Sequence, residues 1–166
     1  MSYTYLFALT DGGGTVAPEL GVAQRLTARG HRAEVLAEDS MAEAVAAVGA
    51  AFHPWRRGLN RPDHRPEHAP YKEWELHNPA RLVRSMIEHL ITGPAEGYAV
   101  DVTDALQANP PDLVVVSFFA FGAMVAAEAN AAGGQRRPGR LARCRCGAAA
   151  HGVAGEARRC HPARTR

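Results

Sequence analysis

A short apolar segment opens the chain and runs through a glycine-rich loop into a helix. Residues 3–9 (YTYLFAL) end before Asp11 and three glycines, which is typical of a buried strand closed by a loop. Pro18 suits the first turn of a helix, and apolar residues then recur at helical spacing until Gly30. A second strand is expected at residues 32–37, a short helix at 41–48 and a third strand at 51–54. This alternation with short connections predicts an α/β fold, a Rossmann-like parallel sheet with flanking helices.

The second half of the chain repeats the alternation. Residues 79–91 and 94–108 predict two amphipathic helices. Residues 113–116 (LVVV) predict a strand that is buried on both faces, and residues 122–132 a helix of small side chains. Ligands of open parallel sheets lie at the carboxyl ends of the strands. The loops at residues 10–17 and 117–121 are therefore the predicted walls of a site.

A long irregular segment at residues 55–78 interrupts this pattern, and loops of this length in compact domains are usually functional or mobile. Its aromatic residues are Trp55, Tyr71 and Trp74. They either line a pocket as flat apolar surfaces or pack the segment back onto the domain. The same choice applies at the end of the last strand, where a mixed role in core and pocket wall is expected for Phe118, Phe119 and Phe121.

Composition divides the 166 residues near Ala132. Residues 1–132 contain ten Lys and Arg against sixteen Asp and Glu, whereas residues 133–166 contain nine Arg, a single Glu and all three Cys. We expect one folded domain at 1–132 and a basic tail without regular structure at 133–166. The tail lacks apolar periodicity, which suggests a shifted reading frame. A nucleic-acid-binding tail is the rival, disfavoured because the tail has no Lys. No apolar run of membrane-spanning length and no secretory signal is visible, so a cytoplasmic protein without a membrane span is expected.

The glycine-rich loop also fits a loose dinucleotide fingerprint. Residues 12–17 match G-x-G-x-x-A, and Glu38 or Asp39 stands where an acid that binds ribose is expected. This pattern suggests a small NAD(P)-binding oxidoreductase domain as one alternative. A tight turn that needs glycine for its dihedral angles is the other interpretation, and Pro18 removes one N–H donor from the start of the helix.

Metal binding is not expected from the histidines and cysteines. His64 and His68 are four residues apart, but Pro66 between them argues against a helix that would align them. Cys144 and Cys146 have a C-x-C spacing in a featureless context. We therefore predict no metal site.

Three segments resemble the N-terminal half of the GT-B glycosyltransferases, in particular the branch that acts on macrolides and other antibiotics. They are GTVAPEL at residues 14–20, LTARGHRAEV at 26–35 and PDLVVVSFFAFGAMVAAEA at 111–129. The resemblance implies a two-domain enzyme whose N-terminal domain binds the acceptor. The C-terminal domain, which has no counterpart in this sequence, mainly binds the nucleoside-diphosphate sugar. It therefore implies no cofactor for this chain and no activity of the chain alone.

The resemblance also implies where catalytic residues belong. The family's G-H-x-x-P pattern puts its general-base His at Thr15, beside Gly14, and its orienting Asp at or next to Ser117. Both would be replaced by hydroxyls, which cannot act as general bases near neutral pH. The acceptor could be acidic enough to need no base, the chain could be a non-catalytic relative, or the register could slip so that Asp11 takes part. Taken alone, Thr15 also fits the hydroxyl that caps a helix.

The function that the resemblance implies is acceptor binding in the transfer of a sugar to a small-molecule aglycone of polyketide type. The aromatic residues named above, together with Gly14, would then contact the acceptor. A non-catalytic auxiliary partner of a glycosyltransferase is a further alternative. The expected partners are the aglycone and either a complete glycosyltransferase or a second copy of the chain, and no nucleic acid.

Overall fold

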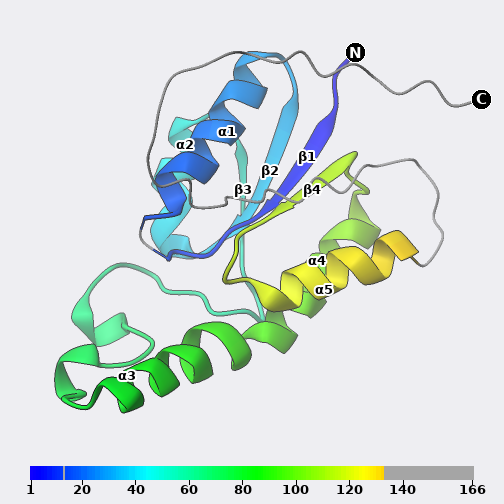
Figure 1. The fold of residues 1–166 in the computed structure, drawn as a ribbon. Helices are drawn as coiled ribbons and strands as arrows, with labels where there is room; N and C mark the ends of the chain where they lie inside the picture. Colours follow the sequence, from blue (N-terminus) through cyan, green and yellow to red (C-terminus); the bar gives the residue numbers. More distant parts are fainter. Residues whose placement is uncertain (13, 133–166) are drawn as a thin grey trace, which may run out of the picture.

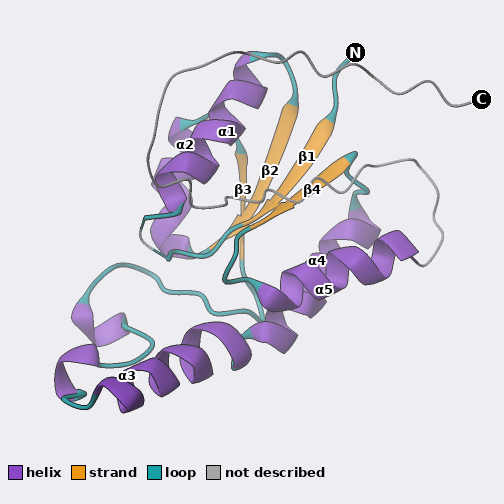
Figure 2. Ribbon diagram, in the orientation of Figure 1, coloured by secondary structure: helices purple, strands orange, loops and turns teal. Residues whose placement is uncertain are grey.

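The computed structural model describes residues 1–12 and 14–132, and its core is a four-stranded parallel sheet of order β3-β2-β1-β4. Every strand predicted from the sequence forms (Figures 1 and 2). The strands are β1 (Thr4–Ala8), β2 (Arg32–Ala37), β3 (Ala51–Pro54) and β4 (Leu113–Val116). The α/β fold class is thereby confirmed. The predicted tail, its cysteines and the suggested change of frame lie outside the described residues.

Helices cover both faces of the sheet (Figure 1). One face carries α1 (Val16–Ala28) and α2 (Ala42–Ala47), and the other carries α4 (Ala95–Ala108) and α5 (Phe121–Ala132). Side chains of β1 alternate between the two cores, as the period of a strand requires. Phe7 and Leu9 pack with Leu20 of α1, whereas Leu6 and Ala8 pack with Val102 of α4.

Glycine is required at two kinds of position. Gly30 and Gly49 follow α1 and α2 with φ angles of 81° and 74°, the left-handed conformation that ends many helices. At Gly122 the constraint is space, because a Cβ there would collide with the carbonyl oxygen of Ala95. That close approach lets α5 pack directly against α4.

A helical arm extends from the sheet between β3 and α4 (Figure 1). It contains the turns η2 (Pro66–His68) and η3 (Glu73–Glu75), then α3 (Pro79–Met86), which continues into η4 (Ile87–Thr92). Asn78 caps α3, since its Oδ1 accepts a hydrogen bond from the Ala80 amide at 2.9 Å. The predicted amphipathic helix at 79–91 therefore forms, but Val83 and Ile87 on its apolar side are exposed. A further turn, η1 (Asp39–Met41), precedes α2. Among the described residues, no helix is both long and apolar enough to cross a membrane.

Candidate functional site at the carboxyl edge of the sheet

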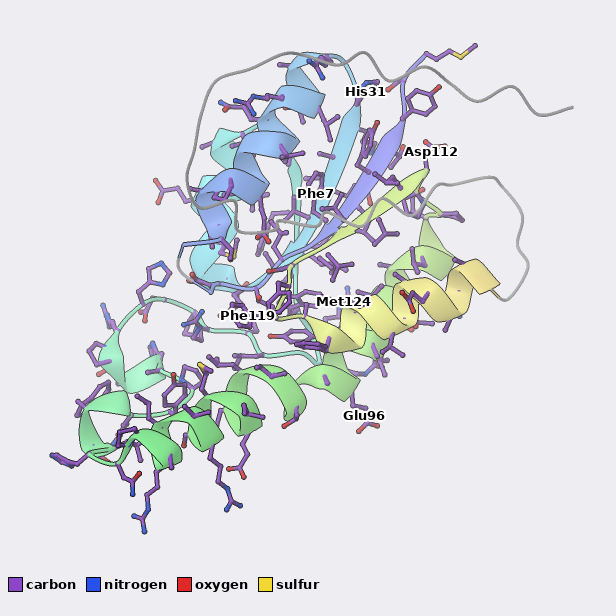
Figure 3. All side chains as sticks on the ribbon, viewed as in Figure 1. Phe7, His31, Glu96, Asp112, Phe119 and Met124 are labelled. Carbon is purple, nitrogen blue, oxygen red and sulfur yellow. The ribbon has the colours of Figure 1, made fainter. Side chains whose placement is uncertain are left out.

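The two loops predicted as site walls meet at the carboxyl edge of the sheet. The ring of Phe119, in the loop after β4, lies against the glycine-rich loop after β1 (Figure 3). A Cβ built on Gly12 would stand 3.0 Å from that ring and 3.4 Å from Thr15 Oγ1. Gly14 is exposed, and a Cβ there would meet nothing within 4 Å. Close packing therefore favours glycine at Gly12 but not at Gly14.

Ser117 is fully buried at the end of β4 and links two elements of this edge. Its Oγ accepts a hydrogen bond from Thr10 Oγ1 at 3.3 Å. The Ser117 hydroxyl also lies close enough to the carboxyl group of Glu19, in the first turn of α1, to lower the pKa of that group. The position that the resemblance assigns to an orienting Asp thus holds a hydroxyl that serves a neighbouring carboxylate.

Glu19 is the carboxylate of this group. Burial raises the pKa of its side chain, and the hydrogen bond from Ser117 opposes that rise in part. A carboxyl group with a raised pKa in a cleft or loop cluster is a frequent sign of a functional site. Sequence reasoning missed Glu19, although its place in the first turn of the predicted helix was visible.

Thr15 directly precedes α1 but does not cap it. Its backbone is helical, with φ −85° and ψ −24°, and its side chain makes no capping hydrogen bond. The capping interpretation of Thr15 is therefore wrong. Its Oγ1 is buried and, like Glu19 Oε2, lacks a hydrogen-bond partner among the residues described.

A second polar cluster occupies the β1–β2 side of the same edge and is fully connected. Glu38, only 1% exposed, pairs with the Arg61 guanidinium and accepts a hydrogen bond from the Asp11 amide at 2.9 Å. Arg61 Nη2 also donates to the Asp11 carbonyl oxygen at 2.7 Å and lies 3.4 Å from Asp11 Oδ2. Burial alone would lower the pKa of Arg61, but Glu38 and Asp11 outweigh that effect and raise it. His64 Nδ1 lies 3.2 Å from Asp11 Oδ2 at the exposed side.

This second cluster bears on the dinucleotide fingerprint. The acid that would bind ribose is either enclosed, as for Glu38, or already paired, as for Asp39, whose Oδ2 accepts from Asn60 Nδ2 at 3.0 Å. Glu38 is therefore closed to ribose hydroxyls, whereas Asp39 is exposed and keeps lone pairs open. The geometry disfavours Glu38 as the ribose-binding acid of the NAD(P) alternative.

The predicted aromatic contacts separate into three places. For Trp55 the packing alternative holds: it is 2% exposed, donates from Nε1 to the Leu9 carbonyl at 3.0 Å and packs against Tyr98. Tyr71 and Trp74 belong to the helical arm, where Trp74 is 53% exposed and Tyr71 contacts the ring of His89.

The three phenylalanines do gather at the carboxyl edge. The Phe118 ring lies 5.4 Å from that of Phe119 and 5.9 Å from that of Phe121. Phe118 and Phe121 remain exposed. They form an exposed aromatic surface directly after Ser117 in the chain, and the adjoining Phe119 ring lies against Gly12, which is also close to Thr15.

The structure also contains a buried carboxylate that no sequence signal revealed. Asp101 of α4 accepts hydrogen bonds through Oδ2 from the amides of Arg56, Arg57 and Gly58, at 2.8, 2.8 and 3.1 Å. It fixes the chain as it leaves β3, just before the segment that supplies Arg61. Asp101 therefore helps to hold in place the segment that carries Arg61 of the second polar cluster.

Two histidines of the segment after β3 each contact one acidic side chain. His68 Nδ1 lies 2.5 Å from Asp63 Oδ1, and His64 contacts Asp11. Over the part of the chain that is described, no group of three or more His, Cys, Asp or Glu could hold a metal ion.

Comparison with known proteins gives likeness at the level of structure. No protein-family profile matches the sequence, and no curated protein matches it. The glycotransferase of kitacinnamycin matches at a TM-score of 0.58 with 20% identity, over 78% of this chain and 28% of its own. The calicheamicin glycosyltransferase CalG4 matches at 0.52 with 29% identity, over 78% and 30%. Arabidopsis thaliana UGT89C1, solved with UDP-L-rhamnose, matches at 0.55 with 17% identity, over 79% and 34%. This chain thus spans about a third of the length of these enzymes.

Proposed function

Because this chain has the fold found in part of the GT-B glycosyltransferases, as its sequence predicts, we propose that it binds the acceptor in a glycosyl transfer reaction. The sugar would come from a nucleoside diphosphate and pass to a small-molecule aglycone. The observation that carries the proposal is the carboxyl edge. There, an exposed aromatic surface borders a group of polar side chains with incomplete hydrogen bonding.

The aromatic surface suits one part of such an aglycone. Phe118 and Phe121 are 66% and 41% exposed and stand beside each other at the end of β4 and the start of α5. Exposed aromatic rings bind flat apolar molecules through large contact areas. Ligand sites combine such apolar walls with a few polar groups that fix orientation, and the polar side chains at this edge of the sheet include Thr15 and Glu19.

We do not assign binding of the sugar donor to this chain. The resemblance assigns the nucleoside-diphosphate sugar mainly to a second domain, and this chain covers only 28%, 30% and 34% of the three enzymes compared. We expect the 166-residue chain alone not to transfer sugar. Measuring sugar transfer with the purified chain and nucleoside-diphosphate sugars checks this expectation, and turnover by the chain alone contradicts it.

Acceptor binding is tested with the purified chain and a panel of flat aromatic aglycones, by isothermal titration calorimetry. We expect micromolar to millimolar binding that weakens about thirtyfold or more in the double variant Phe118→Ala/Phe121→Ala, because each buried ring contributes about 1 kcal/mol or more. Tyr3→Ala is the matched control, since Tyr3 is an exposed aromatic residue just before β1, at the opposite edge of the sheet. Absence of any binding to the panel, or equal loss in the control, contradicts the proposal.

A parallel titration with NADH separates the oxidoreductase alternative. Nicotinamide fluorescence should not change on addition of the chain, because Glu38 is enclosed by Arg61 and the Asp11 amide. Tight binding of NADH would restore that alternative.

A further inference from the structure

The two edges of the sheet differ in how well they are protected. The strand order β3-β2-β1-β4 makes β3 and β4 the edge strands (Figure 1). Pro54 ends β3 and has no N–H to donate, and His53 Nε2 beside it lies 3.8 Å from Glu34 Oε2. Proline and polar side chains are common means by which a sheet edge avoids pairing with another chain. The strand β4, with the sequence LVVV, has neither.

The outer side of β4 is open. β4 pairs with β1 on one side, and no other strand of the described residues pairs with it. All four residues of β4 (Leu113–Val116) are partly exposed, whereas Leu6, Phe7 and Ala8 of β1 are buried. An open edge presents a row of backbone N–H and C=O groups without strand partners, and such a row is a template for a further strand.

The surface next to this open edge is apolar and uncharged. Residues 113–127 contain no charged side chain. The helix α5 follows β4 and lies beside α4 on one face of the sheet (Figures 1 and 3). On the outer side of α5, Val125 is 66% exposed and Ala129 is exposed as well. Because a helix that follows an edge strand packs toward the position of the next strand, a strand added beside β4 is expected to bring its own chain against α5.

The sequence after α5 does not offer that strand. Residues 133–166 contain one Leu and one Val, and no Ile, Phe, Tyr or Trp. Strands are rich in β-branched and aromatic side chains. A partner for β4 is therefore expected from another molecule.

A second copy of the chain satisfies these conditions. Two β4 strands that pair antiparallel about a twofold axis present the same side chains to each other, as an interface between identical copies requires. β-branched side chains pair well across antiparallel strands. Residues 1–132 contain six more acidic than basic residues, and two such copies avoid contact between like charges where both surfaces are uncharged. The pairing also covers both open edges at once, because only the two β3 edges with Pro54 then remain.

We propose that the chain forms a homodimer through the open edge of β4, in which two β4 strands pair antiparallel and the two α5 helices lie on the same face of a continuous sheet. This inference goes beyond the proposed function and does not depend on it. Antiparallel pairing places the carboxyl ends of the two β4 strands at opposite ends of the interface. The aromatic surfaces of Phe118 and Phe121 therefore lie apart in the dimer.

Sedimentation velocity of the full chain measures the dimer. We expect a concentration-dependent dimer with a dissociation constant of about micromolar size, as interfaces of modest area give. Leu113→Lys places a charge at the start of β4, on a residue that belongs to neither core. It should weaken the dimer about tenfold or more, because pairing removes that charge from water. Val125→Lys changes an exposed side chain of α5 and should weaken the dimer in the same direction.

Two lysine substitutions elsewhere are the matched controls. Ala51→Lys changes the exposed first residue of β3, which corresponds to Leu113 on the protected edge. Val22→Lys changes an exposed valine of α1, on the other face of the sheet. Both should leave the dissociation constant within about twofold of the wild type. Circular dichroism verifies folding of each variant, and the surface variant Val125→Lys keeps the test decisive if Leu113→Lys does not fold.

Amide hydrogen exchange locates the contact. Exchange at residues 113–116 should slow as the protein concentration rises, because the outer amides of β4 become hydrogen-bonded in the dimer. Exchange at residues 51–54 of β3 should not change with concentration. Phe118 and Phe121 are unaltered in every variant, so acceptor binding can be measured separately from dimer formation.

The following results overturn the proposal. A chain that stays monomeric at about 100 micromolar leaves the edge of β4 to a strand of a different polypeptide. A dimer that persists unchanged in both Leu113→Lys and Val125→Lys uses another surface. Equal weakening in the two control variants, or open-ended aggregates in place of a dimer, likewise contradicts twofold pairing at β4.

Discussion

Two glutamates at the carboxyl edge of the sheet have opposite environments. Glu38, after β2, is almost fully buried and is enclosed by the Arg61 guanidinium and the Asp11 amide. Glu19, at the start of α1, is partly buried, receives one hydroxyl and leaves Oε2 without a partner. The charge of Glu38 is therefore neutralised by groups of the same chain, whereas one oxygen of Glu19 has no hydrogen-bond donor within the chain.

This difference shows how one fold divides its polar residues between structure and binding. A buried ion pair holds its elements together because removal of either partner leaves an unpaired charge. A carboxylate oxygen without a partner opposes folding. Each of the following changes tests this division by removing or adding a partner.

Removal of Arg61 should have the largest effect. Arg61→Met keeps much of the side-chain volume but leaves Glu38 charged and buried, so we expect a loss of about 3 to 5 kcal/mol in the free energy of unfolding. Urea denaturation near pH 7 measures it. Arg65→Met is the control, since Arg65 is 70% exposed and pairs only with Asp63 and Glu67 at the surface. It should lose less than about 1 kcal/mol. Equal losses in the two variants would remove the structural role of the Glu38–Arg61 pair.

The sequence predicts the elements of this molecule better than the contacts at their ends. Apolar periodicity indicates each strand and helix, because one buried face recurs at a fixed spacing in every element. Ser117 was predicted as a site residue because it follows the carboxyl end of a strand and because the resemblance puts an orienting Asp there. The structure adds that β4 lies beside β1. Helix capping was predicted less well, since Thr15 does not cap α1.

The polar partners could not be predicted in this way. Arg61 reaches Glu38 across 23 residues, and Asp101 reaches the Arg57 amide across 44. Each pairing depends on how an irregular segment folds back, and no spacing in the sequence indicates it. Glu19 is different, because its position in the first turn of α1 was visible in the sequence, but its partial burial was not.

Asp101 provides a third carboxylate for the comparison. Backbone amides supply its close hydrogen bonds, and the Arg57 guanidinium lies farther away, at 3.9 Å. Asp101→Ala leaves the amides of residues 56–58 without an acceptor, and we expect a loss of about 3 kcal/mol in the free energy of unfolding. Asp104→Ala is the control on the same helix, because Asp104 is exposed and pairs with Arg57 only through side chains. That change should cost about 0.5 kcal/mol. Thermal denaturation of both variants measures the contrast, which disappears if the three amides find water instead.

Removing the charge of Glu19 should stabilise the protein, whereas removing the partner of Glu38 should destabilise it. Glu19→Gln removes an incompletely solvated charge, so we expect the variant to be about 1 kcal/mol more stable than wild type near pH 7. The pKa of Glu19 is raised in the folded state, so its charge opposes folding above that pKa. Below the ordinary glutamate pKa, both the folded and unfolded states hold Glu19 protonated, and the gain should vanish. Urea denaturation over a pH series measures this. Destabilisation by Glu19→Gln near pH 7 contradicts the assignment.

Ser117 allows the finest adjustment of the same carboxylate. Ser117→Ala removes the hydroxyl whose hydrogen bond holds the pKa of Glu19 down, so that pKa should rise further above its ordinary value. Titration of the Glu19 side-chain carboxyl by carbon NMR measures the change, with Ser40→Ala as control because the Ser40 hydroxyl bonds Asp11 instead. Ser117 has no charge, so any shift reports the hydrogen bond and not a lost ion pair. If the Glu19 titration is identical in wild type and Ser117→Ala, the Ser117 hydroxyl does not influence Glu19, and burial alone sets the basicity of the Glu19 carboxylate.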